Sequence, residues 1–468
     1  MSESPAGEGS FAGGGDGLHI EVRGPRVLAG LKEALRDAVR SGRLAPGARL
    51  PSSRALAADL GVARNTVVAA YAELTAEGWL SSRQGAATRV ATTLSSPSSG
   101  QPRAAGGPVP PLHDLRPGTP DVSAFPRAEW LRAARRALGR IPDRALGYPD
   151  VRGAEELRIA LAAYLARARG VRAEPGRIVI CAGAAHGLRL IAAVLRARGS
   201  DTLVTEGYGL DVHRRLLAGS GLRTPCLPSD ERGARTDLLT NTANAGAVLL
   251  TPSHQFPSGA VLSGDRRAAV IGWARRAGGL VVEDDYDGEF RYDSPPVGSL
   301  QALDPEHVLY LGTASKTLAP GLRLGWMVVP ETFADEMAGE LGEVGVCGTP
   351  DQLVLAELLE SGGYGRHVRA MRTRYRRRRD QLTVALAGRA HARLSGGSAG
   401  LHAIVELPPG REAVVVEAAA ANGLALHGIS RYRHPRASQD RDAIVVGYAT
   451  PSPSAWPGAL AALEAVLR

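Results

Sequence analysis

A stretch of prolines and small residues divides the chain, and it constrains the fold more than any other sequence feature. Residues 90–112 consist almost entirely of Ser, Pro, Gly, Ala and Thr and carry no periodic apolar pattern. Such a composition is typical of a linker that its prolines keep partly extended. With 468 residues in all, the chain is long enough for two or three domains. We expect a flexible tail at 1–24, a small domain at 25–90, a linker at 91–112 and a large domain at 113–468.

Several classes of protein are disfavoured at once. Residues 1–24 are rich in Gly, Ser and Glu and show no basic start followed by an apolar block, so they indicate a tail and not a signal peptide. No uninterrupted apolar stretch approaches the ~20 residues that a membrane span needs. The three cysteines, Cys181, Cys226 and Cys347, have no metal-ligand spacing. Their scatter favours buried, reduced thiols in a cytoplasmic protein that holds no metal.

The net charge of +9 indicates a nucleic-acid partner only if the basic residues gather in one place. Residues 1–90 carry eleven Lys and Arg against nine Asp and Glu, whereas residues 365–380 carry eight arginines against one acid. An arginine run at helical spacing is more often a solvated helix face than a DNA-reading surface. Any case for DNA binding therefore has to come from the residue pattern.

Residues 25–90 carry the signals of a small DNA-binding fold. Leucines at helical spacing, serines placed to cap a helix and glycines placed to end one predict three helices. Two short strands around Gly85 follow them, so that the expected elements are 25–41, 54–60, 63–77, 79–80 and 88–90. Helix, helix, turn, helix and hairpin is the order of a winged helix-turn-helix.

In that fold the N-terminus of the third helix enters the major groove of DNA. Arg64, Asn65 and Thr66 lie there and are able to reach base edges and phosphates. Arg54, at the start of the preceding helix, is placed for a phosphate or a base edge. Taken singly, each of these residues is also what an exposed polar position on a small helical domain looks like.

Taken together, LPSSRALAADLGVARNTVVAAYAELTAEGWL closely resembles the winged helix of GntR-type regulators. The resemblance implies that a double-stranded DNA operator is a partner. It also implies DNA contacts by five residues, namely Arg54, Arg64, Asn65, Thr66 and Gly85. The wing departs slightly, because Gly-Ala-Ala-Thr stands where the family often has Gly-Ser-Gly-Thr.

Arginine supplies nearly every positive charge in the chain, and only two of the 56 basic residues are lysine, Lys32 and Lys316. Schiff-base chemistry is one reason to keep a lysine against such a bias, because arginine cannot perform it. Lys32 fits an exposed helix face. Lys316 instead follows a predicted strand at 308–312, and Thr313 and Arg323 flank it with a hydroxyl and a guanidinium suited to phosphate. The alternative is a structural lysine at a strand end.

Polar groups also follow other predicted strands. Asp284 and Tyr286 lie in an acidic cluster after an apolar strand at 279–282, a pattern that alone also fits a metal site or a solvated loop. The strands alternate with helices in a doubly wound α/β pattern, in which ligands bind at the carboxyl ends of the strands.

Two further groups follow the same rule. Ala184 and Ala185 open a helix after a strand at 178–181, where small residues let the helix amides approach a phosphate. Tyr208 follows a strand at 202–206 and is placed to stack on a ring, although a tyrosine in a surface turn looks the same. An imine-forming lysine, a carboxylate for a pyridine nitrogen, a phosphate cup and an aromatic face are what pyridoxal phosphate requires.

The motifs SHQFPSG, EDDYDGEF and GTASKTLAPGLRLGW make the resemblance specific. From about residue 26 to 450 the chain resembles the MocR-type regulators, which join a GntR winged helix to a fold-type I aminotransferase-like domain. This implies a mixed seven-stranded sheet with a small C-terminal α+β subdomain. It also implies pyridoxal phosphate as cofactor, bound as an aldimine on Lys316. The other cofactor contacts that it implies are Asp284, Tyr286, Tyr208, Thr313, Arg323 and the amides of Ala184 and Ala185.

The same resemblance implies a homodimer. Tyr148, within GYPDVRGAEELR, matches a tyrosine that reaches the phosphate bound by the neighbouring subunit. Oligomers of this kind are most often closed by a two-fold axis.

The sequence departs from active aminotransferases at two places. Phe256 stands where they usually have an asparagine, preceded by His254 and Gln255. They also usually carry an arginine for the substrate carboxylate on a C-terminal strand, and residues 443–449 contain none. Arg431 and Arg433 are weak substitutes. Tyr208-Gly-Leu210 lacks the Tyr-x-Arg pair of the regulator that senses gamma-aminobutyrate, which argues against that effector.

We therefore expect a regulator that senses pyridoxal phosphate or an amine or amino-acid effector, without efficient turnover. The alternative is an active aminotransferase with a DNA-binding arm.

Overall fold

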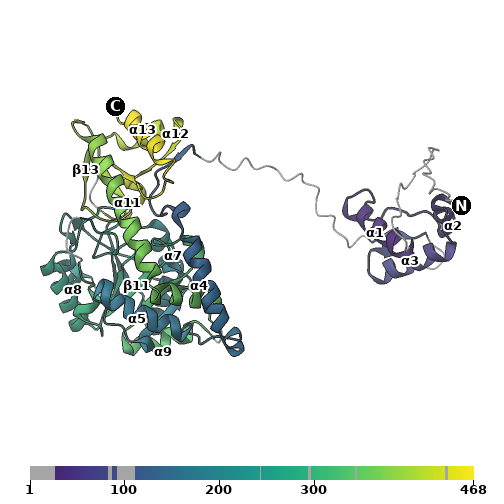
Figure 1. Cartoon of the computed structure of the whole chain (residues 1–468), viewed down its shortest axis with the longest axis horizontal. Coiled ribbons are helices and arrows are strands. Elements are labelled where there is room, and N and C mark those ends of the chain that lie inside the picture. Colours follow the sequence, from purple (N-terminus) through teal and green to yellow (C-terminus); the bar gives the residue numbers. More distant parts are fainter. Residues whose placement is uncertain are drawn as a thin grey trace. The chain divides into compact units, whose positions relative to one another are not determined.

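The structure is a computed structural model and describes residues 27–82, 87–91, 111–242, 244–292, 297–342, 345–389, 391–437 and 441–468. The chain divides into two compact units, Met1–Pro110 and Pro111–Arg468, and each is described by itself (Figure 1). The expected tail at 1–24, Gly85 and most of the expected linker lie outside the described residues.

The first unit has the elements predicted for a winged helix. Its helices are α1 (Val27–Arg40), α2 (Ser53–Leu60) and α3 (Arg64–Ala76), and β1 (Leu80–Ser81) pairs antiparallel with β2 (Arg89–Val90). The Ser52 side chain caps α2 by accepting a hydrogen bond from the amide of Ala55 at 3.2 Å. Gly61 ends the same helix with a φ of 63°, a conformation that glycine adopts without strain.

The second unit is built on a mixed seven-stranded sheet, as expected. In order across the sheet, the strands are β4 (Ile178–Cys181), β12 (Gly325–Val328), β11 (Val308–Thr313), β10 (Leu280–Asp284), β9 (Ala247–Leu250), β5 (Leu203–Glu206) and β6 (Cys226–Leu227). Only β12 runs antiparallel to its neighbours. The strands are almost entirely buried, which is typical of a sheet covered on both faces.

Helices cover the two faces of this sheet. Ile178 and Ile180 pack in the core with helices on one side, and the alternate residues Val179 and Cys181 pack in the core on the other. The helices of the first core are α4 (Arg127–Arg140), α5 (Glu155–Arg169) and α10 (Thr349–Glu360). Helix α8 (Gly264–Ala277) covers the same face farther across the sheet, because Val308 of β11 packs in its core while Tyr310 packs in the first core. The helices of the opposite face are α6 (Ala184–Ala197), α7 (Asp211–Gly219) and α9 (Glu331–Glu340).

A smaller α+β subdomain forms the C-terminal part of this unit. Its antiparallel sheet has the order β13 (Arg393–Ser395), β14 (Ala403–Glu406), β17 (Ala443–Val446) and β16 (His427–Gly428). It packs with α12 (Glu412–Ala421) and α13 (Trp456–Val466). The unit's first strand, β3 (His113–Asp114), also joins this subdomain by pairing with β15 (Leu424–Ala425). The expected fold class is thereby confirmed.

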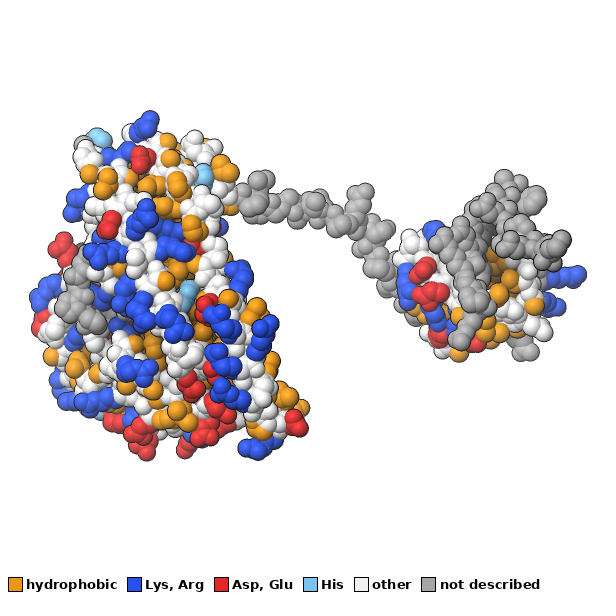
Figure 2. Space-filling model, viewed as in Figure 1, with side chains coloured by type: hydrophobic (Ala, Val, Ile, Leu, Met, Phe, Trp, Pro, Cys, Tyr) orange, Lys and Arg blue, Asp and Glu red, His pale blue; other side chains and the backbone are white. Residues whose placement is uncertain are grey.

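The arginine run corrects one expectation. It lies on α11 (Gly363–Leu386), and several of its side chains are exposed among the basic groups visible in Figure 2. Arg378, however, is only 4% exposed and donates to the backbone oxygen of Tyr448 at 3.2 Å. Both Arg378 and Arg374 also bond to the buried Asp121. One face of the run therefore holds the subdomain in place and is not solvated.

Two smaller expectations concern the cysteines and membrane-spanning helices. Cys181 and Cys347 are buried, Cys226 is half-buried, and all three are free thiols. Among the described helices, none combines the length and apolar character that crossing a membrane requires.

Candidate functional site

The N-terminus of α3 offers the predicted DNA-contact residues together. Arg64 and Asn65 are exposed and Thr66 is half-buried. The preceding residue, Ala63, supplies no side-chain hydrogen bond to the helix start. Amides at an uncapped helix N-terminus remain available to an anion such as a DNA phosphate. Arg54 is exposed in the first turn of α2.

The basic residues of the first unit divide into those that pair with a carboxylate and those that do not. Arg36 of α1 is paired with Glu77 at 2.6 Å, and Lys32 is paired with Glu73. By contrast, none of the ion pairs among the described residues of this unit involves Arg54, Arg64 or Arg49. Arginines without a carboxylate partner are free to neutralise phosphates.

Sequence reasoning missed Arg49. It is exposed and forms an isolated bridge with Arg89 of β2, at the base of the hairpin. The sequence alone gave little indication that Arg49 lies near the wing, because only the folded hairpin brings residues 49 and 89 together.

In the second unit, a cavity of about 290 Å³ lies at the carboxyl ends of the sheet strands. Eight of the nine predicted cofactor residues line it, namely Lys316, Asp284, Tyr286, Tyr208, Thr313, Arg323, Ala184 and Ala185. Seven of them lie at or just after the carboxyl ends of the parallel strands β4, β5, β10 and β11, which lie on one edge of the sheet. Arg323 precedes the antiparallel strand β12, whose amino end lies at the same edge. The ninth, Tyr148, does not line the cavity and is 87% exposed.

Lys316 and Asp284 set the electrostatics of this cavity. Burial lowers the pKa of Lys316, and the nearby carboxylates of Asp284 and Asp287 oppose that shift. Its amine donates to the backbone oxygen of Gly118. Burial also raises the pKa of Asp284 to about 7, against the influence of Lys316. A lysine with a lowered pKa is more readily deprotonated, which a nucleophilic amine requires.

One carboxylate oxygen of Asp284 accepts no hydrogen bond from the described residues. The residue is 6% exposed, and its Oδ1 has no hydrogen-bond partner among the described residues. His213 approaches the other oxygen only to 4.0 Å. A buried acceptor without a donor is costly, and the protonated nitrogen of a pyridine ring would satisfy it. The residues present therefore fit the ring of pyridoxal phosphate.

The other end of the cavity fits a phosphate. Gly183, with a φ of 84°, leads into the first amides of α6. The guanidinium of Arg323 packs over Gly183, where a Cβ would lie 3.4 Å from its Nη1. Thr313 and Ser315 add two hydroxyls that bond to each other at 2.9 Å. Helix amides, a guanidinium and hydroxyls form a cup suited to a dianion.

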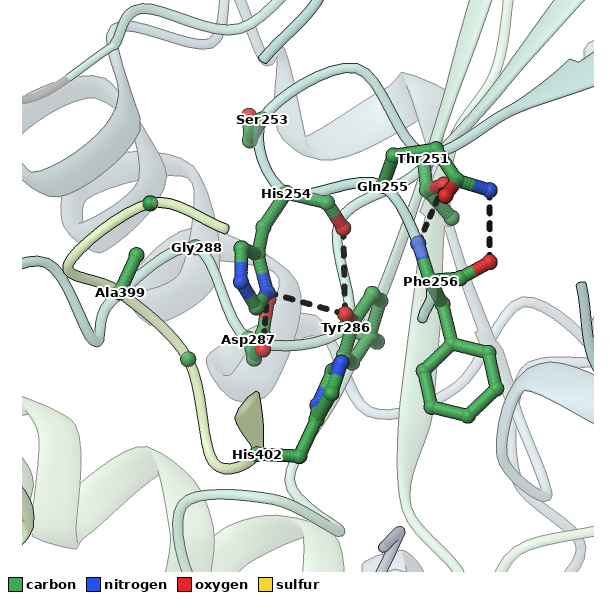
Figure 3. Close-up of polar contacts among 12 residues, drawn as sticks. Thr251, Ser253, His254, Gln255, Phe256, Tyr286, Asp287, Gly288, Ala399 and His402 are labelled. Carbon is green, nitrogen blue, oxygen red and sulfur yellow. Dashed lines mark hydrogen bonds and ion pairs between the residues drawn. The ribbon is translucent and has the colours of Figure 1, made fainter. Parts of the chain in front are cut away.

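Tyr286 and Phe256 also line the cavity, and Figure 3 shows the contacts around them. The hydroxyl of Tyr286 donates to the backbone oxygen of His254 at 3.1 Å. Phe256 packs edge-on against Tyr432, with ring centroids 4.9 Å apart. Tyr208 is buried, and its backbone oxygen accepts from the side chain of Gln255 at 2.9 Å.

Comparison with known proteins matches a family to each of the two units. Residues 118–425 match the family described as aminotransferase class I and II, and residues 29–90 match bacterial regulatory proteins of the gntR family. The chain is 35% identical over 406 residues to the HTH-type pyridoxine biosynthesis transcriptional regulator PdxR of Corynebacterium glutamicum, covering 86% of this chain and 88% of that protein. It is 33% identical over 382 residues to the probable rhizopine catabolism regulatory protein MocR of Rhizobium meliloti, covering 77% and 76%. The chain belongs to the MocR-type transcription regulators.

Solved structures support the fold of this MocR-type regulator. An archaeal alanine:glyoxylate aminotransferase matches with a TM-score of 0.68 at 24% identity, over 78% of this chain and 92% of that one. A kynurenine aminotransferase of Pyrococcus horikoshii matches with a TM-score of 0.67, also at 24% identity, over 77% and 91%.

The regulator's cavity has a third basic lining residue that the sequence analysis did not name. Besides Lys316 and Arg323, the only other Lys or Arg among the described lining residues is Arg214. Its guanidinium donates to the backbone oxygens of Gly209 at 2.9 Å and Tyr432 at 3.1 Å. Arg431 and Arg433, the substitutes suggested by sequence, are not among the residues that line the cavity.

The regulator also has lining residues that the sequence analysis did not name as cofactor contacts, namely Glu206, His213, Thr251, Ser315 and His402. Glu206 ends β5 and accepts from the amide and hydroxyl of Thr251 at 3.0 and 2.6 Å. Its position at a strand's carboxyl end was a usable signal. His213 lies within a helix and His402 lies in the small subdomain, so neither shares a motif with the other cavity residues.

Proposed function

We propose that this regulator binds pyridoxal phosphate on Lys316 and that the cofactor itself is the signal that changes operator binding. Bound there, the cofactor supplies an aldehyde that forms an imine with the lysine amine. Asp284 would hold the ring nitrogen, Arg323 and the first amides of α6 would hold the phosphate, and Tyr208 would pack on the ring. The winged helix would contact the operator through Arg54, Arg64, Asn65 and Thr66.

One observation carries the choice of the cofactor as signal. The cavity has the groups that pyridoxal phosphate requires. The guanidinium of Arg214, however, already donates hydrogen bonds to backbone oxygens and is not available to an effector carboxylate. Among the described lining residues, the only other arginine is Arg323, which lies at the phosphate end of the cavity. A buried carboxylate needs a charged or multiple hydrogen-bond partner, so an amino-acid effector would bind poorly. The similarity to a pyridoxine biosynthesis regulator supports the same choice.

For the signal to work, the cofactor must bind one DNA-binding arrangement of the protein better than another. Only such differential affinity shifts the population of the two arrangements. We propose that these arrangements belong to a homodimer, since the exposed Tyr148 would then reach the phosphate of the other subunit.

The test is an absorbance spectrum of the cofactor-free protein during titration with pyridoxal phosphate, followed by a panel of amino acids. We expect an imine band that no amino acid shifts, together with a change in operator affinity. Lys316→Ala should abolish the band while the fold persists. Lys32→Ala, which changes the chain's only other lysine, is the matched control and should keep it. An unchanged spectrum in Lys316→Ala would disprove the cofactor assignment.

The complete set of Lys316, Asp284 and Tyr286 favours a second candidate, an active aminotransferase with a DNA-binding arm. Release of a keto acid from one amino acid of the panel would favour this enzyme over the sensor. A band that shifts with one amine without keto-acid release would instead identify that amine as the effector.

A further inference from the structure

His254 and Asp287 form a buried pair directly behind Tyr286 (Figure 3). The Nδ1 of His254 lies 2.9 Å from Oδ2 of Asp287 and 3.0 Å from the hydroxyl of Tyr286. Their side chains are 3% and 1% exposed. Neither residue belongs to the set that would contact the cofactor, and both come from motifs that the proposed function leaves unexplained.

The hydrogen bonds fix where the protons lie. A carboxylate can only accept, so Nδ1 of His254 carries a proton and donates it toward Asp287. The hydroxyl oxygen of Tyr286 also lies within hydrogen-bond distance of Nδ1, so the N–H of His254 is shared between Asp287 and Tyr286 in a bifurcated hydrogen bond. Tyr286 must then send its own proton elsewhere, and here it goes to the backbone oxygen of His254. A phenolate oxygen arriving in the cavity would be a stronger acceptor for that proton than a carbonyl, because it is charged.

A turn of the small subdomain seals this pair from water. Gly400 lies against it so closely that a Cβ there would be 2.1 Å from Cε1 of His254 and 2.6 Å from Oδ2 of Asp287. Beyond it, Nε2 of His402 bonds to the backbone oxygen of Pro257 at 3.1 Å. Hydrogen bonds in such a water-excluded setting are stronger and reinforce one another.

The same residues do not make a better metal site. The candidate ligand atoms of His254, Asp287 and His402 all lie within 4.8 Å of one another. However, Nδ1 of His254 already has two hydrogen-bond partners, and Nε2 of His402 has one. These satisfied hydrogen bonds favour a hydrogen-bonded chain over a metal centre.

We propose that His254 and Asp287 are positioning residues that orient the Tyr286 hydroxyl to donate its proton to the phenolic oxygen of pyridoxal phosphate. The proposal rests on the proposed function. It also explains how the site can work with Phe256 in place of a polar side chain. The chain Asp287, His254, Tyr286 then supplies the hydrogen bond on this side of the ring.

The test compares two substitutions of His254 that differ in which ring nitrogen they replace. In His254→Asn the amide nitrogen lies near the position of Nδ1, whereas in His254→Gln it lies nearer that of Nε2. We expect His254→Gln to raise the dissociation constant for pyridoxal phosphate about tenfold, which is the effect of losing one well-placed hydrogen bond. His254→Asn should retain most of the affinity, and Asp287→Asn should behave like His254→Gln.

A double-mutant cycle separates positioning from general packing. Tyr286→Phe should weaken binding by a similar factor, and adding His254→Gln to it should have little further effect, because the hydroxyl to be oriented is gone. At one fixed pH, His254→Gln and Tyr286→Phe should also shift the absorbance of the bound cofactor in the same direction. His307→Gln is the matched control, because His307 also bonds a carboxylate through Nδ1, at 3.1 Å to Asp304, and does not line the cavity.

Several results would overturn the proposal. Additive losses in the cycle, or equal losses for the Asn and Gln variants of His254, would show that the histidine acts only through packing. A wild-type protein that binds pyridoxal phosphate while Asp287→Asn and His254→Gln bind it equally well would refute the positioning role alone. A wild-type protein that fails to bind pyridoxal phosphate at all would refute the proposed function and this inference with it.

Discussion

Glu206 is a buried carboxyl whose charge the fold tolerates poorly. Burial raises its pKa from 4.5 to about 7, although hydrogen bonds from Thr251 oppose the shift. The pKa of Glu206 is higher in the folded protein than in the unfolded chain. The stabilising contribution of Glu206 to the free energy of unfolding is therefore fully present below about pH 4.5. It is lost as pH rises through about 7. The loss across this window is at most about 3 kcal/mol.

This predicts a pH-dependent effect of Glu206→Gln on stability. The variant keeps an oxygen that can accept from Thr251 but cannot ionise. In thermal scans of the cofactor-free protein, it should gain stability relative to wild type at pH 8 and show little gain at pH 4.5. Glu306→Gln is a control, since Glu306 lies in a half-exposed pair with Arg177. An equal effect of Glu206→Gln at both pH values would contradict the prediction.

A second buried group, Arg169, holds the loop that carries Asp284 and Tyr286. Its guanidinium bonds to both oxygens of Asp285 at 2.6 and 3.0 Å, and both side chains are 1% exposed. It also bonds to Ser253 and to the backbone of Gly288. Arg169→Met should cost about 3–5 kcal/mol of unfolding free energy, because it leaves a buried carboxylate unpaired.

The measurement for Arg169→Met is denaturant unfolding of the second unit, with Arg232→Met as comparison. Arg232 pairs with Asp265, but both are 61% exposed, so its loss should cost at most about 1 kcal/mol. Similar costs for the two variants would show that burial does not set the strength of the Arg169 pair.

These residues also mark what sequence could reveal about the site. Lys316 was identifiable because lysine is scarce and because a strand precedes it. Asp284 and Arg323 were identifiable from the same local context and from family resemblance. Glu206 and His402 were not named, and Arg378 was mistaken for a solvated residue. Their environments depend on partners far along the chain, such as Asp121 for Arg378.

At the scale of elements, local signals were nearly sufficient. The predicted strand at 178–181 agrees with β4, and the one at 202–206 agrees with β5 to within one residue, because short apolar runs between turn residues have few alternatives. The start of α2 follows from Ser52 and its end from Gly61. The order of the strands in the sheet and the antiparallel direction of β12 depend on long-range packing, so the sequence did not predict them. The family resemblance implied only a mixed seven-stranded sheet.

Helix α3, which we propose reads DNA, supports a prediction of its own. Arg64 opens α3 and is exposed, with no ion pair among the described residues of its unit. Arg64→Ala should weaken operator binding by about 1–3 kcal/mol if it contacts a base with two hydrogen bonds. Arg40→Ala removes a cation that Glu33 already pairs at 3.1 Å, so it should change binding much less.

Fluorescence anisotropy with an operator fragment and a scrambled fragment distinguishes the possible roles of Arg64. A loss confined to the operator indicates base reading. An equal loss on both fragments, with a smaller salt dependence, indicates a phosphate contact. No loss on either fragment would remove Arg64 from the interface.

At the scale of the whole molecule, the open question is how a cofactor event in one unit reaches the other. Residues 90–112 have the composition of a linker, and a linker by itself transmits little. A homodimer changes this, because two winged helices then address two half-sites whose spacing the dimer sets. The proposed dimer therefore matters for regulation as much as for cofactor binding.

Mixing two variants, each impaired in cofactor binding, tests that dimer. Tyr148 is 87% exposed in the single chain, so Tyr148→Phe should leave thermal stability unchanged while it weakens cofactor binding about tenfold, through loss of a hydrogen bond to phosphate. Lys316→Ala cannot form the imine. In a mixed dimer, the Tyr148→Phe chain still supplies Lys316, and the Lys316→Ala chain supplies Tyr148 to the same cavity. One of the two sites is then intact, so mixing the variants under subunit exchange should restore tight imine formation, measured by absorbance at limiting pyridoxal phosphate. If Tyr148 acts within its own chain, or not at all, the mixture will bind no better than the average of its two components.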